Sequence, residues 1–481
     1  MTIEEVRRMP VSRALSGQEA AIRQIFQGDS AFKLRHITSR NGENRYIIAY
    51  FDGMVNTQVV DLHIVRPLTL CEGELTPEVV GERVITVDVY QMAEDYAAAC
   101  EAIVLGDTLI FMEGSDRIIA ANTKGFLMRS ITEPESEKNL RGPREGFNES
   151  IIANTTLLRR RMLSPDLKME FMGVATASTQ KLCICYMDSL VDRNVLARVK
   201  KRLQKLQIRN MLSANYIEEY IRDAGYSPFK TVGSTERPDI VAAKLLEGRV
   251  AIIMDGTPTV LTVPFLFLEY FQVGSDYNSN YWVGTIERLL RIAGVFLSVS
   301  VPALYIALIC FHQELLPIKL LVSIAAARDG VPLSAVLELF VMLIAFELLR
   351  EAGIMLPQGI GNALSTVGGV VIGQAAVEAR FISAPLVIIV AFTGLTDMLA
   401  PKMREAMLLM RLFLLAMASV LGLYGYVLGM GLLLAVLLSI RSFGVPYMAF
   451  LGTWRLRDLW DTGLRAPLWM LHMPSVREWE E

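Results

Sequence analysis

The sequence lacks the features of several common protein classes. It has only five cysteines in 481 residues, and they form no disulfide or zinc-ligand pattern, because the one close pair, Cys183 and Cys185, stands alone on a predicted strand. We therefore expect buried, reduced thiols. The N-terminal residues contain no apolar run, so no cleaved signal sequence is predicted and the polar half of the chain is expected to remain in the cytoplasm.

Residues suited to catalysis are also scarce. His36 and His63 are isolated, and segment 225–233 lacks the glycine–lysine–hydroxyl order of a phosphate-binding loop. Asp52 and Asp188 follow predicted strands and are candidates for acid–base chemistry, but helix N-caps use the same residue type at such positions, and we favour capping. The sequence therefore predicts no catalytic residue, no metal site, no cofactor and no nucleic-acid partner.

Apolar residues are concentrated in the C-terminal half. Hydrophobic residues make up 52% of the chain, and segments beyond residue 290 approach the roughly 20 apolar residues that cross a bilayer. Asp397 and Arg411 are the single charges in two of these segments. The last segment continues its predecessor through Gly425 and Gly429, which indicates a tight helical hairpin. The predicted spans are 292–311, 381–400, 407–426 and 427–440, within an all-α multi-span membrane domain at 292–453.

The N-terminal half is predicted to be α/β. Apolar runs at 33–37 and 46–51 flank the turn Asn41-Gly42, which is typical of a β-hairpin. The strand 108–112 leads through a turn into a returning strand and forms a second hairpin. We also expect helices at 17–26, 54–64, 90–103, 148–162 and 193–209.

Two pairs of similar segments indicate an internal duplication. Residues 46–55 resemble 182–191, and residues 106–120 match 248–262, at offsets of 136 and 142 residues. Convergence of two hairpin folds on one pattern is the alternative. The expected units are a first cytoplasmic α/β subdomain at 1–131, a charged linker at 132–144 and a second, similar subdomain at 145–263.

The segment 264–291 is the predicted entry to the membrane. It combines aromatic and basic side chains, which favour the bilayer interface, so we expect interfacial amphipathic helices in contact with membrane lipids. Arg288 and Arg291 are expected to hold this end on the cytoplasmic side. His312 beside Glu314 either responds to pH or caps a span, and we favour the cap. The candidate entry residues are Glu269, Asp276, Arg288, Arg291, His312 and Glu314.

Four strings in this half carry a resemblance to a known family: PFLFLEYFQVGSDY from residue 264, FHQELLP from 311, FELLREAGIMLP from 346 and GGVVIGQAAVEA from 368. The chain resembles the A subunit of the GerA family of spore germination proteins. Stage V sporulation protein AF is similar in architecture, and the motifs alone separate the two poorly.

The resemblance implies a germinant receptor subunit in the inner membrane of the dormant spore. A subunits are expected to form a homo-oligomeric ring beside a transporter-like B subunit, which binds the nutrient, and a lipoprotein C subunit. Family members look like nutrient-gated channels for monovalent cations.

The polar stretch 314–380 contains charges that lipid would reject. Glu347, Arg350 and Glu351 share one helix face and are expected to neutralise one another. Glu338 lies half a turn away from that face. It is either an acid that faces permeating cations or the partner of an arginine from another helix or subunit.

Small residues recur every four positions in the same stretch. Gly361, Ser365, Gly369 and Gly373 would lie on one helix ridge, with Gln374 beside them, and small residues allow close helix packing in lipid. Copies of this helix around an axis would line a pore. Ordinary packing between two helices of one chain is the alternative.

Three functional interpretations follow. A gated cation channel subunit accounts for the charges, whereas a non-conducting membrane scaffold would only recruit partners. A secondary transporter would predict inverted repeats among the spans, and we see none. In each case the N-terminus and the tail 454–481 are expected on the cytoplasmic side. The stretch 314–380 either crosses the membrane fully or forms a re-entrant element.

Overall fold

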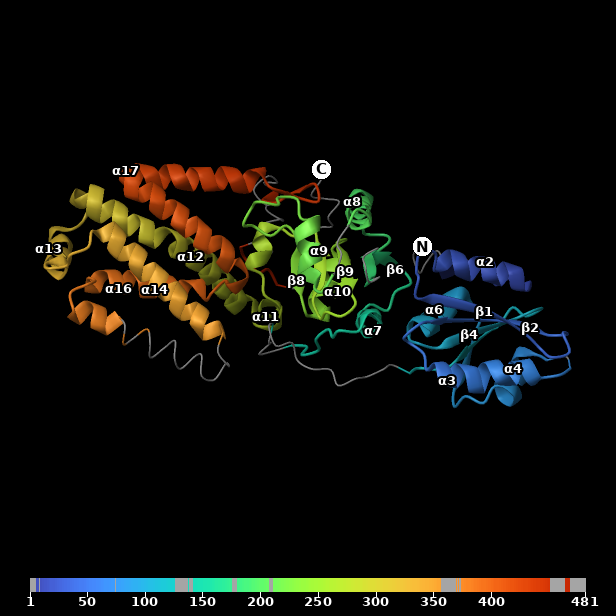
Figure 1. Cartoon of the computed structure of the whole chain (residues 1–481). Helices are drawn as coiled ribbons and strands as arrows, with labels where there is room; N and C mark the ends of the chain where they lie inside the picture. Colours follow the sequence, from blue (N-terminus) through green and yellow to red (C-terminus); the bar gives the residue numbers. More distant parts are fainter. Residues whose placement is uncertain are drawn as a thin grey trace.

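Three bodies follow one another along the long axis of the molecule (Figure 1). The first α/β subdomain, drawn in blue, lies at one end, the second, in green, lies in the middle, and a helical body, from yellow to red, lies at the other end. The structure is a computed structural model. It describes residues 6–7, 9–73, 75–125, 137, 142–174, 180–206, 211–355, 369, 371, 373–449 and 463–467.

The first subdomain is built on an antiparallel sheet with the strand order β1-β2-β4-β5-β3. Alternate residues of β2 face opposite sides: Ile47 and Ala49 pack with α2 and α6, whereas Ile48 packs with the helices that follow β2. Each face of the sheet therefore has its own apolar core. The elements are α2 (Leu15–Ile25), β1 (Phe32–Thr38), β2 (Arg45–Phe51), α3 (Thr57–Val60), η1 (Asp61–Val65), α4 (Arg66–Leu70), α5 (Pro77–Val79), η2 (Val80–Val84), β3 (Tyr90–Ala93), α6 (Tyr96–Val104), β4 (Thr108–Met112) and β5 (Ile118–Ala121).

The helix predicted at 90–103 is wrong in its first turn. Residues Tyr90–Ala93 form the edge strand β3, which pairs with β5. The helix α6 begins only after Asp95, whose carboxylate accepts a hydrogen bond of 2.7 Å from the backbone N–H of Ala98. Pairing with an existing strand therefore overrides the helical pattern of the sequence.

The capping assignments of Asp52 and Asp188 are also wrong. Asn56 caps α3 and Asp192 caps α8, each with a side-chain oxygen that accepts from the backbone N–H two residues later. Both caps lie four residues after the predicted position, since a short turn separates each strand from the helix that follows it.

The second subdomain repeats the topology of the first. Its sheet has the order β6-β7-β9-β10-β8, which is the same sequence of first, second, fourth, fifth and third strand. This correspondence is what the two pairs of similar segments predict. The elements are α7 (Ile151–Arg161), β6 (Leu167–Val174), β7 (Gln180–Met187), α8 (Arg193–Gln204), α9 (Ala214–Ile221), β8 (Gly233–Thr235), α10 (Pro238–Leu246), β9 (Val250–Met254) and β10 (Val260–Val263).

A buried ion pair joins the two subdomains. Arg159 of α7 pairs with Asp29 of the first subdomain, and its guanidinium carbon lies 3.9 Å from the ring centroid of Phe51. The ammonium group of Lys168 donates to the carbonyl of Ile25 at 2.9 Å. An unpaired charge at this depth would be costly, so these contacts favour one fixed orientation of the two units.

The helical body starts differently from the predicted pair of interfacial helices. Residues 264–271 pack against the second subdomain, with Phe265 and Leu266 buried. The predicted second amphipathic run and first span are one helix, α12, which begins at Tyr281. The elements are η3 (Phe267–Tyr270), α11 (Gly274–Asn278), α12 (Tyr281–Ile306), η4 (Ala307–Phe311), η5 (Gln313–Leu315), α13 (Ile318–Arg328), α14 (Ala335–Met355), α16 (Ala384–Asp397), η6 (Pro401–Met403), α17 (Arg404–Ser439), β11 (Arg441–Ser442) and β12 (Val445–Pro446).

The helix α17 folds back on itself at Gly422. This residue has φ 62° and ψ −136°, a conformation that favours glycine. A Cβ atom at Gly429 would lie 2.9 Å from a methyl group of Leu414, so the two arms run side by side. The predicted hairpin is therefore present, but it turns three residues before Gly425.

The returning arm of α17 ends in the second subdomain. Phe443 and Val445, in the hairpin β11–β12, belong to the apolar core of that subdomain. The hydroxyl of Ser442 donates to the carbonyl of Thr231 at 2.7 Å and accepts from the backbone N–H of Phe265 at 3.0 Å. The second subdomain thus holds both the entry to and the exit from the helical body.

Two helical stretches among the described residues, 281–311 and 401–439, are long and apolar enough to cross a membrane. The shorter α16 and the charged α14 lie beside α12 in the same body (Figure 1). Charges at both ends of α14 lower its apolar character.

Candidate functional site

A cluster of charges lies inside the helical body. It consists of three acids and three arginines from α14, α16 and α17, and we call it the charge cluster: Glu347, Arg350, Glu351, Asp397, Arg404 and Arg411.

Asp397 and Arg411 form the centre of the charge cluster. Their side chains are 6% and 2% exposed, and a guanidinium nitrogen of Arg411 lies 2.5 Å from the Asp397 carboxylate. Ser298 of α12 donates its hydroxyl to Asp397 and accepts from Arg411 at 2.7 Å. These two charges, each alone in its predicted span, therefore neutralise one another across two helices.

The rest of the charge cluster extends from this centre to the surface. Arg350 pairs with Glu347, as their spacing on the helix predicts, and lies 3.4 Å from Asp397. Arg404 approaches Glu347 at 4.0 Å and Glu351 at 3.8 Å, and the Glu351 side chain is 58% exposed. The charge cluster thus connects a buried pair to an exposed acid.

Glu338 lies away from this cluster and is fully buried. One carboxylate oxygen accepts from the backbone N–H and the hydroxyl of Ser383, at 2.5 and 2.6 Å, and so binds the N-terminus of α16. The other lies 3.6 Å from the guanidinium of Arg328. The geometry favours the arginine-pairing interpretation of Glu338 over the cation-facing one.

The small-residue ridge is only partly within the described residues. Gly361 and Ser365 lie outside them. A Cβ atom at Gly369 would meet no other atom within 4 Å, and one at Gly373 would lie 3.7 Å from a methyl group of Val387. Gln374 is exposed and donates to Glu378 at 2.9 Å. Of the two glycines, Gly369 is therefore exposed, whereas Gly373 is buried against Val387.

The predicted entry residues separate into different environments. Asp276 is fully buried and accepts from Arg291 at 2.6 Å, with Arg288 at 3.5 Å, so these arginines face a carboxylate. His312 lies 3.4 Å from the carbonyl of Ala307, which suits a helix cap, and Glu314 is exposed. No contact joins His312 to Glu314 in the described part of the chain.

Glu269 belongs to the junction between the second subdomain and the helical body. It pairs with Lys244 of α10 and with Arg249, which precedes β9. Burial alone would raise the pKa of the Glu269 carboxyl, but Arg249 and Lys244 together hold that pKa below its usual value. The group is therefore a structural anion at neutral pH.

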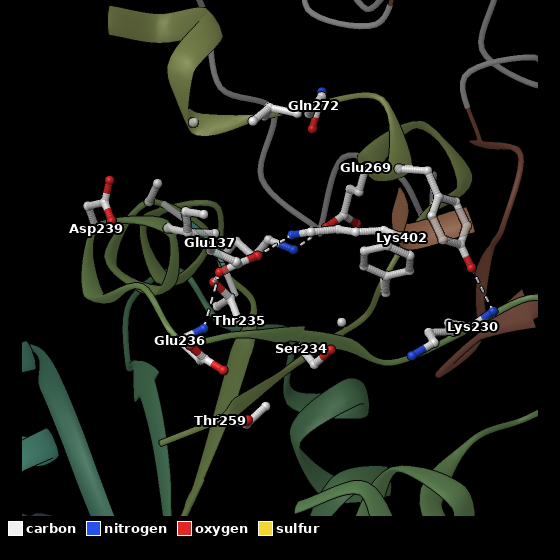
Figure 2. Close-up of a pocket in the computed structure, with 18 of the residues that line it drawn as sticks. Glu137, Lys230, Ser234, Thr235, Glu236, Asp239, Thr259, Glu269, Gln272 and Lys402 are labelled. Carbon is white, nitrogen blue, oxygen red and sulfur yellow. Dashed lines mark hydrogen bonds and ion pairs between the residues drawn. The ribbon is translucent and has the colours of Figure 1, made fainter. Parts of the chain in front are cut away.

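A cavity of about 760 Å³ opens at the same junction (Figure 2). Its walls come from β8, α10, η3, α11 and η6, and Glu137 of the predicted linker reaches into it. Figure 2 shows the side chain of Lys402 pointing across the cavity toward Glu137. The distance between the Glu137 carboxylate and the Lys402 ammonium is 2.5 Å.

The Glu137 carboxylate has donors on both oxygens. The second oxygen accepts from the hydroxyl of Thr235 at 2.5 Å and from the backbone N–H of Glu236 at 3.2 Å. Burial would raise the pKa of Glu137, but Lys402, Thr235 and the Glu236 backbone together lower it. Glu137 is therefore held as an anion against both the second subdomain and η6, which precedes α17.

Sequence reasoning missed the two main features of this region. Asp397 and Arg411 are each the single charge of a predicted span. Their pairing follows if a lone charge in one apolar helix is expected to pair with an opposite charge in another. Nothing in the sequence indicates the Glu137–Lys402 pair, because 265 residues separate them. The described residues contain no group of three or more His, Cys, Asp or Glu side chains suited to a metal ion.

Comparison with known proteins identifies the family. The family model described as "Bacillus/Clostridium GerA spore germination protein" matches residues 20–476. Spore germination protein KA of Bacillus subtilis (strain 168) is 37% identical over 97% of this chain and 87% of its own length. Uncharacterized membrane protein YfkQ of the same organism is 36% identical over 98% and 92%.

A relative and a solved structure from other species also match. Spore germination protein GerLA of Bacillus cereus is 32% identical over 94% of this chain and 92% of its own length. The N-terminal domain of the A subunit of the Bacillus megaterium spore germinant receptor GerK3 is 27% identical and covers 54% of this chain and 98% of its own, with a TM-score of 0.44. The chain belongs to the GerA family of spore germination proteins.

Proposed function

We propose that the chain is the A subunit of a spore germinant receptor and that copies of it form a gated channel for monovalent cations. In this proposal a transporter-like B subunit senses the nutrient, a lipoprotein C subunit completes the receptor, and the complex lies in the spore inner membrane. Opening of the channel releases cations from the spore core and starts germination.

The charge cluster is the observation that carries this proposal. Ionisable groups among apolar helices are expensive and commonly mark ion pathways. The charge cluster joins α14, α16 and α17 and contacts α12 through Ser298, so a shift of one helix changes the partners of the others. Such a network of alternative ion pairs suits a gate.

Exposed polar groups in the helical body support an oligomer. Glu351, Gln374 and Glu378 are exposed in the single chain. In lipid these groups would be unfavourable, whereas in a ring they would face water on the axis. Gly369 has open space above its backbone, which leaves room for a neighbouring helix.

Ion flux from proteoliposomes tests the proposal. The full chain is reconstituted with its B and C subunits around a potassium-sensitive dye, and the nutrient is added outside. We expect nutrient-dependent potassium release that requires the A subunit. Absence of flux with all subunits and nutrient present, together with intact complex formation, would favour a non-conducting scaffold.

Two substitutions assign the ion pathway. Glu351→Gln removes an exposed charge and is expected to reduce the preference for cations over anions about tenfold or less, because acidic rings set charge selectivity. Glu338→Gln removes a buried acid that binds α16 and is expected to leave selectivity unchanged while it alters opening. A selectivity change in Glu338→Gln alone would reverse the two roles.

A further inference from the structure

The cavity between the second subdomain and the helical body contains a site built for a carboxylate. Lys402 donates to one oxygen of the Glu137 carboxylate, and Thr235 and the backbone N–H of Glu236 donate to the other. The carboxylate therefore has a directed donor for each oxygen. Two of these donors precede α10, a helix of nine residues whose N-terminus also favours negative charge.

The group that occupies this site comes from the predicted linker. Glu137 belongs to neither sheet, and 98 residues separate it from Thr235, to which it is hydrogen-bonded. The remaining volume of about 760 Å³ is large enough for a small organic molecule. A free carboxylate that entered this space would compete with Glu137 for the same donors.

The walls of the cavity indicate the rest of such a ligand. Phe265 and Tyr270 are buried and meet edge to face, with ring centroids 5.1 Å apart, and Val232, Ile240 and Ala243 add apolar surface. These side chains favour a flat or apolar body over a highly charged one. Of the other acids that line the cavity, Asp239, Glu247 and Glu269 have arginine or lysine partners, and Glu236 supplies its backbone N–H to the site.

We propose that this cavity binds a small monocarboxylate with an apolar or aromatic body, which displaces Glu137 from Lys402, Thr235 and Glu236. Displacement releases Lys402, which lies in η6 immediately before α17, from its ion pair with Glu137. Lys402 lies two residues before Arg404, which approaches Glu347 and Glu351 of the charge cluster. Binding therefore acts on the charge cluster, and this regulatory consequence rests on the proposed function, whereas the binding site does not.

Titration of the full-length chain in detergent with benzoate tests the site. Calorimetry is expected to show saturable binding of benzoate and none of benzamide, because the neutral amide cannot pair with Lys402. Acetate has the carboxylate without the ring and is expected to bind more weakly than benzoate. Equal binding of benzamide and benzoate, or tighter binding of inorganic phosphate than of benzoate, would overturn the proposal.

Three variants locate the binding. Glu137→Gln removes the competing charge and is expected to tighten benzoate binding about tenfold, whereas Lys402→Gln is expected to weaken it about tenfold or more. Lys201→Gln changes an exposed lysine of α8 and should match the unmodified chain. Unchanged affinity in both cavity variants would place benzoate elsewhere and refute the assignment.

The binding result and the flux result fail independently. Benzoate binding without any nutrient-dependent potassium release would support the binding site and contradict the channel function. Potassium release from a chain that binds no benzoate would support the channel function and contradict the binding site. If both hold, benzoate is expected to shift the nutrient dose needed for release in the unmodified chain and not in Lys402→Gln.

Discussion

At the scale of single residues, the pair of Asp397 and Arg411 shows how charges persist among apolar helices. Each side chain is almost fully buried, and the two share Ser298 as a further hydrogen-bond partner. Removal of one charge leaves the other buried without compensation, which costs far more than the net gain from the pair. The stability of the helical body should therefore depend on both residues together.

We expect Arg411→Gln to lower the free energy of unfolding by about 3–5 kcal/mol, since it strands the Asp397 carboxylate. Thermal unfolding in detergent measures the loss. Arg404→Gln removes a more exposed arginine, whose contacts are 3.8 and 4.0 Å, and should cost about 1 kcal/mol or less. The double variant Asp397→Asn with Arg411→Gln should be more stable than Arg411→Gln, and equal stability would show that the two charges are not coupled.

Glu269 makes a pH-dependent contribution at the same scale. Its folded pKa lies below the ordinary value of 4.5, so the folded state binds fewer protons than the unfolded state near that pH. The stabilisation is therefore present above pH 4.5 and is lost as the pH falls through the folded pKa. We expect the unfolding temperature of the full chain to fall below pH 4.5, with a smaller fall for Glu269→Gln. Identical pH profiles would contradict this assignment.

At the scale of elements, the turn within α17 depends on one glycine. Gly422 has φ 62°, and a Cβ atom there would lie 2.8 Å from Phe311 and 3.1 Å from His312. Gly422→Ala should therefore cost about 1–3 kcal/mol through backbone strain, with the crowding added. Gly431 is helical with no atom near its Cβ position, so Gly431→Ala should gain about 1 kcal/mol or less. Equal melting temperatures for the two variants would show that the turn tolerates a side chain.

The sequence predicted the elements better than their connections. Alternating apolar residues in β2 and the turn Asn41-Gly42 define the first hairpin, because these signals are local. The strand β3 was missed, since an edge strand of four residues is determined by its partner β5 and not by its own pattern. The sequence predicts the turn of the last hairpin through Gly425 and Gly429, whereas the structure turns at Gly422, which alone among the three has a positive φ, 62°.

The charged residues of the candidate site were predictable only in part. The pair Glu347–Arg350 follows from helix spacing alone. Glu338 contacts Ser383, which precedes α16, and Arg328, the last residue of α13. No pattern within the single sequence specifies these partners. Contacts between distant segments depend on how the helices cross, and the sequence does not contain that information in a local form.

At the scale of the whole molecule, the second subdomain is the common anchor of the helical body. It contacts residues 264–271, η6 through the pair of Glu137 and Lys402, and the hairpin β11–β12. The turn of α17 lies at the end of the body away from the subdomains (Figure 1), and Gly422 in this turn lies beside Phe311. A membrane around the helices would therefore separate the two α/β subdomains from the turn at Gly422.

Labelling of Cys310 tests this arrangement, because this exposed thiol lies beside Phe311 at the far end. Cys100, Cys183 and Cys185 are buried and Cys71 is half-buried, so Cys71→Ser leaves Cys310 as the exposed native thiol among the described residues. In sealed vesicles we expect an impermeant maleimide to label Cys310 only from the side opposite the α/β subdomains. A matched chain with Cys71→Ser, Cys310→Ser and Lys201→Cys should react from the subdomain side. Labelling of both chains from one side would mean that the helical body does not span the membrane between these positions.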